Sequence, residues 1–230
     1  MATIDFATHE TVLGELRGAF PTAVLDGPVD TASYEAAPVR ILWILREVYG
    51  DGTPWDLRGF LGDREKLFSY PRWHATYGLV AKVSHGLLHA IPPAGFHQLS
   101  AREAAQALDS IAVINLNKLG GGAQVNWPTF LERVRQFETF AARQVKALAP
   151  EMVIAAGTFD VLPATIRSSL QHAETGGHSY SHATMPFLVR AHHPGQRRMR
   201  HDTYYGNIAS QLEQAGWTGI RARRSRPPEG

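Results

Sequence analysis

The sequence predicts an α/β fold in which a four-stranded parallel sheet lies between two layers of helices. The first observation is a set of four short apolar runs, typical of strands buried on both faces, at residues 41–45, 109–116, 152–156 and 187–191. The second is that segments with helical spacing alternate with these runs, as parallel connections require. The third is that three of the runs end in polar residues, where open α/β sheets place their ligands.

The first half of the chain supplies two predicted helices and one strand. Apolar residues recur at helical intervals over residues 9–20, and an irregular connector is expected over residues 22–37. After the first strand, a long loop runs through three aromatic residues, Trp55, Phe60 and Phe68. Helical spacing returns over residues 75–91, where two prolines end the helix.

The second half alternates more regularly. Ser100 and Glu103 form a capping box for a short helix through Leu108. The remaining predicted elements, in order, are a strand at 109–116, an amphipathic helix at 128–148, a strand at 152–156, a helix near 162–171, a polar His-rich segment at 172–182, a strand at 187–191 and a helix capped by Asp202 and ending at Gly216.

We expect one domain over residues 1–220, with an N-terminal helical extension, and a disordered basic tail over residues 221–230. The 230 residues contain no cysteine, which excludes disulfides, thiol catalysis and cysteine metal sites. No run approaches the length of a membrane span and no signal-peptide pattern opens the chain, so a cytoplasmic location is expected, with no membrane partner. Seven arginines lie between Gln196 and Arg226, which favours a polyanionic partner.

Groups capable of chemistry follow three of the predicted strands. Glu47 and Tyr49 follow the first, Asn115, Asn117 and Lys118 the second, and His193 the last. Parallel strands bring these ends to one edge of the sheet, where they can share a pocket. A carboxylate that orients water, an amide that reads a base edge and an imidazole that stabilises a leaving base suit hydrolysis of an N-glycosidic bond.

These segments resemble, in order, the motifs of the uracil-DNA glycosylase superfamily. LREVY resembles the GQDPY motif of its best-known branch and puts Glu47 at the water-activating Asp and Tyr49 at the Tyr that guards the pocket. VIN matches the strand that ends in the base-reading Asn, here Asn115, and His193-Pro194 matches HPS, although Gly195 replaces its Ser. The resemblance spans residues 39–206 and implies a uracil-DNA glycosylase-like fold.

The resemblance also implies roles for other residues. An aromatic side chain stacks on the flipped base, for which Phe60 is the best-spaced candidate and Trp55 the next. The loop after the HP motif enters DNA, either duplex or single-stranded. There Met199 would be the wedge and three arginines, together with Lys118, would contact the phosphates: Arg197, Arg198 and Arg200.

Other interpretations stay open at this point. Tyr49 can simply pack in its loop, either asparagine can cap a turn, and Lys118 can be a surface charge. Five histidines can suggest a metal site, but no metal-binding motif accompanies them, so we expect neither a metal nor a cofactor: His172, His178, His182, His192 and His193. The function predicted is a DNA glycosylase-like hydrolase of a damaged or deaminated base. The alternatives are a catalytically altered nucleic-acid or nucleotide-binding protein of the same fold, and a hydrolase of free nucleosides or nucleotides.

Overall fold

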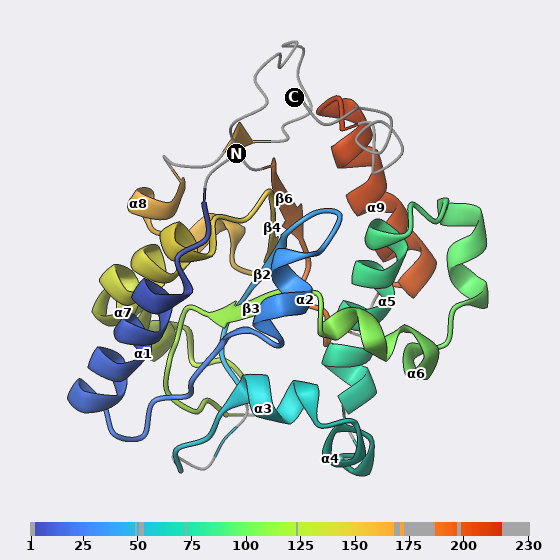
Figure 1. The fold of residues 1–230 in the computed structure, drawn as a ribbon. Helices are drawn as coiled ribbons and strands as arrows, with labels where there is room; N and C mark the ends of the chain where they lie inside the picture. The colour runs from blue at the N-terminus through green and yellow to red at the C-terminus, as the bar shows by residue number, and fades with distance from the viewer. Residues whose placement is uncertain are drawn as a thin grey trace, which may run out of the picture.

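The computed structural model describes residues 3–48, 50, 53–71, 73–122, 124–167, 171–172, 187–196 and 199–217 (Figure 1). The helices and strands are, in chain order, α1 (Phe6–Ala19), β1 (Gly27–Pro28), α2 (Thr31–Glu35), β2 (Ile41–Leu45), α3 (Leu57–Gly62), α4 (Arg64–Ser69), α5 (Trp73–Leu88), η1 (Pro93–Gln98), α6 (Ala101–Ala104), η2 (Ala105–Leu108), β3 (Ile111–Asn115), α7 (Trp127–Leu148), β4 (Met152–Ala156), η3 (Phe159–Val161), α8 (Ala164–Arg167), β5 (Gln171–His172), β6 (Phe187–Ala191) and α9 (His201–Gln214).

The chain has an α/β fold built on a mostly parallel sheet. The strand order is β1-β3-β2-β4-β6-β5, and the four predicted strands β3, β2, β4 and β6 pair in parallel with their neighbours. The described sheet has six strands, not the four expected, because β1 pairs antiparallel with β3 and β5 pairs parallel with β6 at its edges. Each of these two strands is two residues long, too short to leave a pattern in the sequence.

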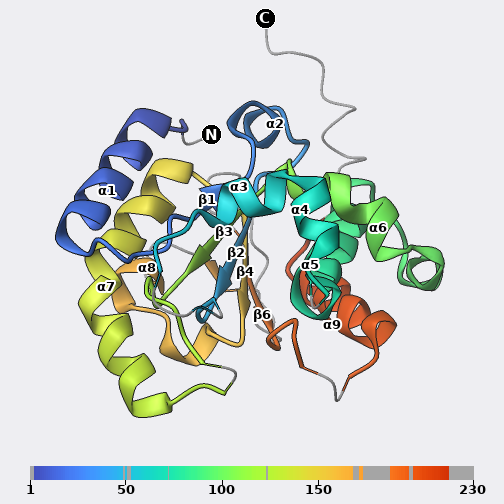
Figure 2. The ribbon, with the colours of Figure 1, turned by 90° about the horizontal axis from the view of Figure 1, so that it is seen from below.

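Helices cover both faces of the sheet (Figures 1 and 2). Ile41, Trp43 and Leu45 of β2 belong to one apolar cluster, which includes side chains of α5 and α9. Leu42 and Ile44 belong to a second cluster on the other face, with side chains of α7. Because successive side chains of a strand point to opposite faces, the unbroken apolar run of β2 serves both clusters.

Most of the predicted helices are found with small shifts of their ends, and the capping box at Ser100 and Glu103 is confirmed. The helix expected near residues 162–171 is described only as the four-residue α8, and Gln171 belongs to β5 instead. Segments expected to be irregular contain α2, α3 and α4, which are only five or six residues long. An aspartate side chain caps each of them: Asp30, Asp56 and Asp63. The prediction that Asp202 caps α9 is wrong: the N-cap residue is Arg200, and Asp202 lies inside the first turn.

Within the described residues, no helix is both long enough and apolar enough to cross a membrane. The predicted basic tail over residues 221–230 lies outside the described residues.

Candidate active site

A cavity of about 640 Å³ opens beside the carboxyl ends of β2 and β6, a size typical of small-molecule sites. The chain passes from β2 to β3 on one side and later to β4 on the other. Open α/β sheets bind ligands in the crevice outside the strand ends where the order changes in this way. The cavity is lined by Leu45, Arg46, Glu47, Val48, Gly50, Thr53, Trp55, Phe60, Tyr70, Ala75, Thr76, Tyr77, Gly122, Val125, His193 and Gly195.

Glu47 leaves the end of β2 and is held by a residue that follows β3. The Asn117 side-chain Nδ2 donates a hydrogen bond to Glu47 Oε2 at 2.8 Å. The same amide accepts a hydrogen bond through Oδ1 from the Leu119 backbone N–H at 3.0 Å, which fixes its orientation. Glu47 is only partly buried and lines the cavity. A carboxylate oriented in this way can position a water molecule or balance a positive charge.

The loops after β2 and β3 run side by side, joined by backbone hydrogen bonds. The Asn117 N–H donates to Arg46 O at 2.9 Å, and the Gly121 N–H donates to Val48 O at 2.8 Å. A Cβ on Gly121 would overlap the Glu47 carboxyl group, and a Cβ on Gly120 would lie 3.0 Å from the Gly50 carbonyl oxygen. Gly120 and Gly121 are therefore explained by the close approach of the two loops.

His193 reaches the cavity from the loop after β6. Its Nδ1 accepts a hydrogen bond from the Gly195 backbone N–H at 3.1 Å. Burial, with a smaller contribution from the Arg46 cation, lowers the pKa of His193 to about 4. The imidazole is therefore neutral near pH 7, with Nδ1 as the acceptor, so its proton is on Nε2. That N–H can donate to a ligand on which negative charge develops.

Gly195 stands where the resembled motif has Ser, and the structure gives a physical reason for the smaller residue. A Cβ at Gly195 would lie 2.9 Å from Thr76 Oγ1 of α5 and 3.3 Å from His193 Nδ1. Glycine lets the loop pass close to α5 while its N–H stays bonded to the imidazole.

Aromatic rings form much of the cavity wall. Phe60 lies among Trp55, Tyr70 and Tyr77, with ring centroids 5.7, 5.9 and 6.2 Å away in edge-to-face arrangements. Both residues predicted to stack on a base, Phe60 and Trp55, line the cavity. Tyr70 and Tyr77 were not predicted, although both lie in the polar-aromatic stretch that precedes and begins α5.

Asn115 and Lys118 do not take the places expected of them. Both are completely buried, and neither lines the cavity. Lys118 Nζ forms an ion pair with Asp26 Oδ1 at 2.8 Å, and the Asn115 backbone N–H donates to Asp26 Oδ2 at 2.7 Å. The expectation that Lys118 contacts DNA is therefore wrong, because its charge is neutralised inside the protein. The amide that meets the cavity carboxylate belongs to Asn117 instead.

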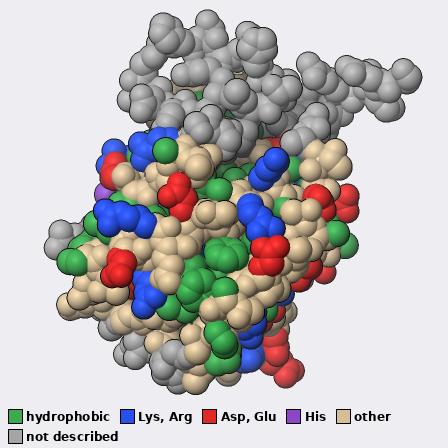
Figure 3. Space-filling model, turned by 90° about the vertical axis from the view of Figure 1, so that its left-hand side faces the viewer, with side chains coloured by type: hydrophobic (Ala, Val, Ile, Leu, Met, Phe, Trp, Pro, Cys, Tyr) green, Lys and Arg blue, Asp and Glu red, His purple; other side chains and the backbone are tan. Residues whose placement is uncertain are grey.

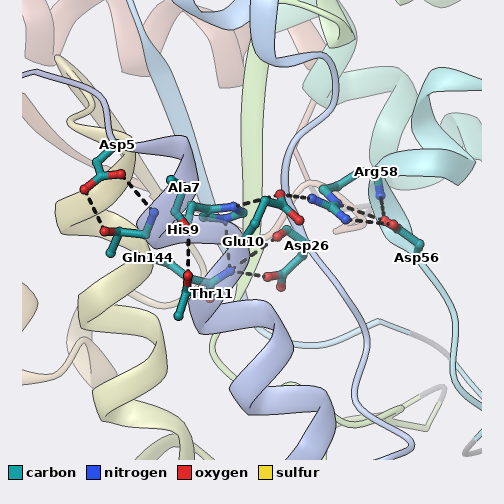
Figure 4. A network of polar contacts seen from close by, with 10 residues as sticks. Asp5, Ala7, His9, Glu10, Thr11, Asp26, Asp56, Arg58 and Gln144 are labelled. Carbon is teal, nitrogen blue, oxygen red and sulfur yellow. Dashed lines mark hydrogen bonds and ion pairs between the residues drawn. The ribbon is translucent and has the colours of Figure 1, made fainter.

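Asp26 is also the end of a longer polar network (Figure 4). The Gln144 Nε2 of α7 donates to Asp26 Oδ1 at 3.0 Å and lies 3.4 Å from the His9 Nε2 of α1. From His9 the network continues through Glu10 to Arg58 in α3. It joins three helices to the end of β3, and none of these residues lines the cavity.

The predicted DNA-contacting loop is described only in part. Met199 is partly buried and packs against the apolar core, and its backbone N–H is bonded to Gln196 Oε1 at 2.8 Å. Arg200 is 83% exposed and is paired with Asp202. Tyr49, Arg197 and Arg198 lie outside the described residues.

Of the predicted histidine cluster, only His192 and His193 have described side chains. Among the described side chains, no group of three or more His, Cys, Asp or Glu residues is arranged to hold a metal ion.

Charge is mixed on the side of the molecule where α1, α7 and α8 lie. Figure 3 shows acidic and basic side chains interspersed there around a patch of apolar ones. The described side chains on that side do not form a surface of one sign, such as nucleic-acid binding uses.

Comparison with models of known protein families finds none that matches the chain, and comparison with curated proteins likewise finds no match. The assignment of function therefore depends on the geometry of the cavity.

Proposed function

We propose that the chain is a DNA glycosylase-like hydrolase that cleaves the N-glycosidic bond of a damaged or deaminated base, on a fold of the uracil-DNA glycosylase type. The observation that carries this proposal is that Glu47 and His193 line one cavity whose walls include four aromatic rings. A flat heterocycle fits between such rings, with a carboxylate and a neutral imidazole at its edges.

The reaction breaks the bond between the sugar C1′ and the base nitrogen. Glu47 orients a water molecule toward C1′, offsets the positive charge that develops on the sugar and accepts the proton that the water loses. His193 Nε2–H donates a hydrogen bond to the base, which leaves with the bonding electron pair. Asn117 acts as a positioning residue because its amide fixes the Glu47 carboxylate.

The resemblance to the superfamily supports the same assignment. The segments containing Glu47 and His193 resemble its first and last motifs, and they follow the first and last of the long parallel strands. The assigned base reader, Asn115, is the main departure, because it is bonded to Asp26.

A hydrolase or binding protein for free nucleosides or nucleotides is the second candidate. It is favoured by the burial of Lys118 and by the packing of Met199 against the core, which remove a predicted phosphate contact and weaken the predicted wedge.

The test is to incubate the protein with oligonucleotides carrying uracil, hypoxanthine, xanthine or oxidised bases, and in parallel with the corresponding nucleosides. Abasic sites are then cleaved with alkali, and released bases are separated by chromatography.

Glu47→Gln should lower the rate of release by about 10²–10⁴-fold, because the amide cannot accept the proton. Glu132→Gln, at an exposed position of α7, is the matched control and should keep the native rate. The proposal is contradicted if the protein releases no base from either the oligonucleotides or the nucleosides. It is also contradicted if the Glu47→Gln variant releases the base at the native rate.

A further inference from the structure

Two histidines lie one helical turn apart at the carboxyl end of α5, outside the cavity. His85 is in the last turn of α5, and His89 directly follows its final residue. Residues four apart on a helix lie on the same face, and here the two imidazole rings are neighbours, with centroids 4.3 Å apart and planes inclined by 43°. Neither ring lines the cavity, and neither belongs to the histidine cluster predicted from the sequence. The pair therefore needs an explanation of its own.

The spacing of the two rings matches that of imidazoles that share one metal ion. An ion bound at about 2.0–2.1 Å to one nitrogen of each ring separates the centroids by about 4.5 Å when the angle at the metal is a right angle, and by about 5.2 Å when it is tetrahedral. The observed 4.3 Å is closer to the first value. Right angles are typical of the square-planar and tetragonal sites of Cu²⁺ and Ni²⁺, whereas protein sites for Zn²⁺ are mostly tetrahedral.

Both imidazoles are available as ligands. The His85 side chain is half-buried and His89 is exposed. Among the residues that the structure describes, no hydrogen bond or ion pair occupies a nitrogen of either ring. Burial, followed by repulsion from His89, lowers the pKa of His85. The His85 ring is therefore neutral near pH 7, which is the form in which an imidazole binds a metal ion.

The backbone that carries the pair is held in place. The His89 N–H donates to His85 O at 3.0 Å, and the Ile91 N–H donates to Gly86 O at 2.8 Å. Tyr205 of α9 secures the same end of α5: its hydroxyl donates to Ile91 O at 2.6 Å, and its ring lies so close that a Cβ on Gly86 would be 2.9 Å from it. A pair of ligands held in this way loses little conformational freedom when it binds an ion.

The charges around the pair leave room for a cation. The last carbonyl groups of a helix carry partial negative charge, which favours a cation at this end of α5. Lys82, three residues before His85, opposes it, but the Lys82 ammonium is held 4.8 Å from the centroid of the Phe96 ring. Among the described side chains no third His, Cys, Asp or Glu residue completes the pair, so water must fill the other positions around an ion.

We propose that His85 and His89 form a binding site for one transition-metal ion, Cu²⁺ or Ni²⁺, whose remaining coordination positions are occupied by water. The site is independent of the proposed hydrolysis, because neither residue belongs to the cavity that contains Glu47 and His193. Since water molecules exchange, the bound ion keeps positions open for a further ligand.

The test titrates the full chain, freed of metal by a chelator and dialysis, with Cu²⁺, Ni²⁺, Zn²⁺ and Mg²⁺ salts in a calorimeter. Cu²⁺ should bind more tightly than Zn²⁺, and Mg²⁺ should not bind. His85→Gln and His89→Gln should each weaken Cu²⁺ binding by about tenfold or more, because one imidazole then acts without its partner. His97→Gln, at an exposed position of η1, is the matched control and should bind as the native protein does. Native affinity in both single variants overturns the inference.

Electron paramagnetic resonance of the Cu²⁺ complex supplies a second measurement that needs only the native protein. At one equivalent of Cu²⁺, the spectrum should show coupling to the nitrogens of two imidazoles, and in either single variant to one. Coupling to fewer than two imidazoles in the native protein overturns the inference, as does a native spectrum in the His85→Gln, His89→Gln double variant. Ni²⁺ should also raise the melting temperature of the native protein but not that of the double variant, because the two rings are held together only in the folded chain.

Discussion

The Asn117 amide donates to the Glu47 carboxylate at 2.8 Å while its own oxygen accepts from the Leu119 backbone at 3.0 Å. The two residues are seventy positions apart in the chain. They meet because β2 and β3 are parallel neighbours in register, with Leu45 opposite Asn115. The orientation of Glu47 is therefore determined by the loop after the adjacent strand, and it can be altered without touching Glu47 itself.

Replacing Asn117 should lower hydrolysis while leaving the fold intact. Asn117→Ala removes the donor to the carboxylate, a charge-assisted hydrogen bond of the kind that contributes about 1.5–3 kcal/mol. If that bond matters in the transition state, the single-turnover rate falls by about 10–100-fold. Asn117→Asp should be worse, because a second carboxylate would face the first. A native rate in either variant, with an unchanged melting temperature, would remove Asn117 from the positioning of Glu47.

Because the pKa of His193 is about 4, we expect the free energy of unfolding to fall as the pH is lowered. The ordinary value is 6.5, so as the pH falls the unfolded chain takes up this proton before the folded protein does. Stability from the neutral ring is complete above about pH 6.5 and is lost progressively toward pH 4, at no more than about 1.4 kcal/mol per pH unit. Urea unfolding of the native protein and of His193→Gln should show the steeper loss in the native protein. NMR should report an Nε2-protonated ring at neutral pH, and a higher pKa in Arg46→Met.

The parallel core was predictable because buried strands and amphipathic helices leave strong patterns. The run at residues 41–45 and the helix through residue 148 are found almost where their periodicity puts them. By contrast, α3 and α4 are six residues long and depend on the capping aspartates Asp56 and Asp63, so no hydrophobic period marks them. Likewise, β1 is a strand only through its pairing with β3, which no local sequence pattern indicates.

The sequence predicted where the candidate site lies, at the carboxyl edge of the sheet, but not which residues after β3 take part in it. Parallel strands bring Glu47 and His193 to one cavity, as the topology requires. The choice between Asn115 and Asn117 depended on Asp26, which lies in the irregular connector and engages both the Asn115 backbone and Lys118. Nothing in the sequence near Asp26 signals a buried ion pair, so the roles of Asn115 and Lys118 were misjudged together.

The buried pair of Asp26 and Lys118 should dominate the stability of this region. Both side chains have no exposed area, so Asp26→Ala leaves an uncompensated buried ammonium and Lys118→Met leaves a buried carboxylate. Each change should cost about 3–5 kcal/mol in the free energy of unfolding, and the double variant should cost much less than the sum. Denaturant unfolding of the native protein, the two single variants and the double variant measures the coupling energy between the two charges. The pair of Arg190 and Asp160, 62% and 70% exposed, is the control and should contribute at most about 1 kcal/mol. Additive costs at Asp26 and Lys118 would show that the two charges do not depend on each other.

Alanine at two adjacent glycines should separate positioning of the site from stability of the fold. A Cβ at position 121 meets the far end of the flexible Glu47 side chain, which can turn away and lose its bond to Asn117. A Cβ at position 120 meets the Gly50 backbone at 3.0–3.2 Å, which cannot move without separating the two loops. Gly121→Ala should therefore reduce hydrolysis by at least about tenfold, with a loss of roughly 1 kcal/mol in stability. Gly120→Ala should instead lower the melting temperature more than Gly121→Ala does.

The control for both glycine variants is Gly14→Ala. Gly14 is exposed inside α1, with no atom within 4 Å of the added Cβ. Alanine there should stabilise the protein by about 0.5–1 kcal/mol, because glycine is the poorer helix former. Rates measured at equal fractions of folded protein then separate the two effects. A Gly121→Ala protein that hydrolyses as fast as the Gly14→Ala control would show that the Glu47 carboxylate does not need the position in which Asn117 holds it.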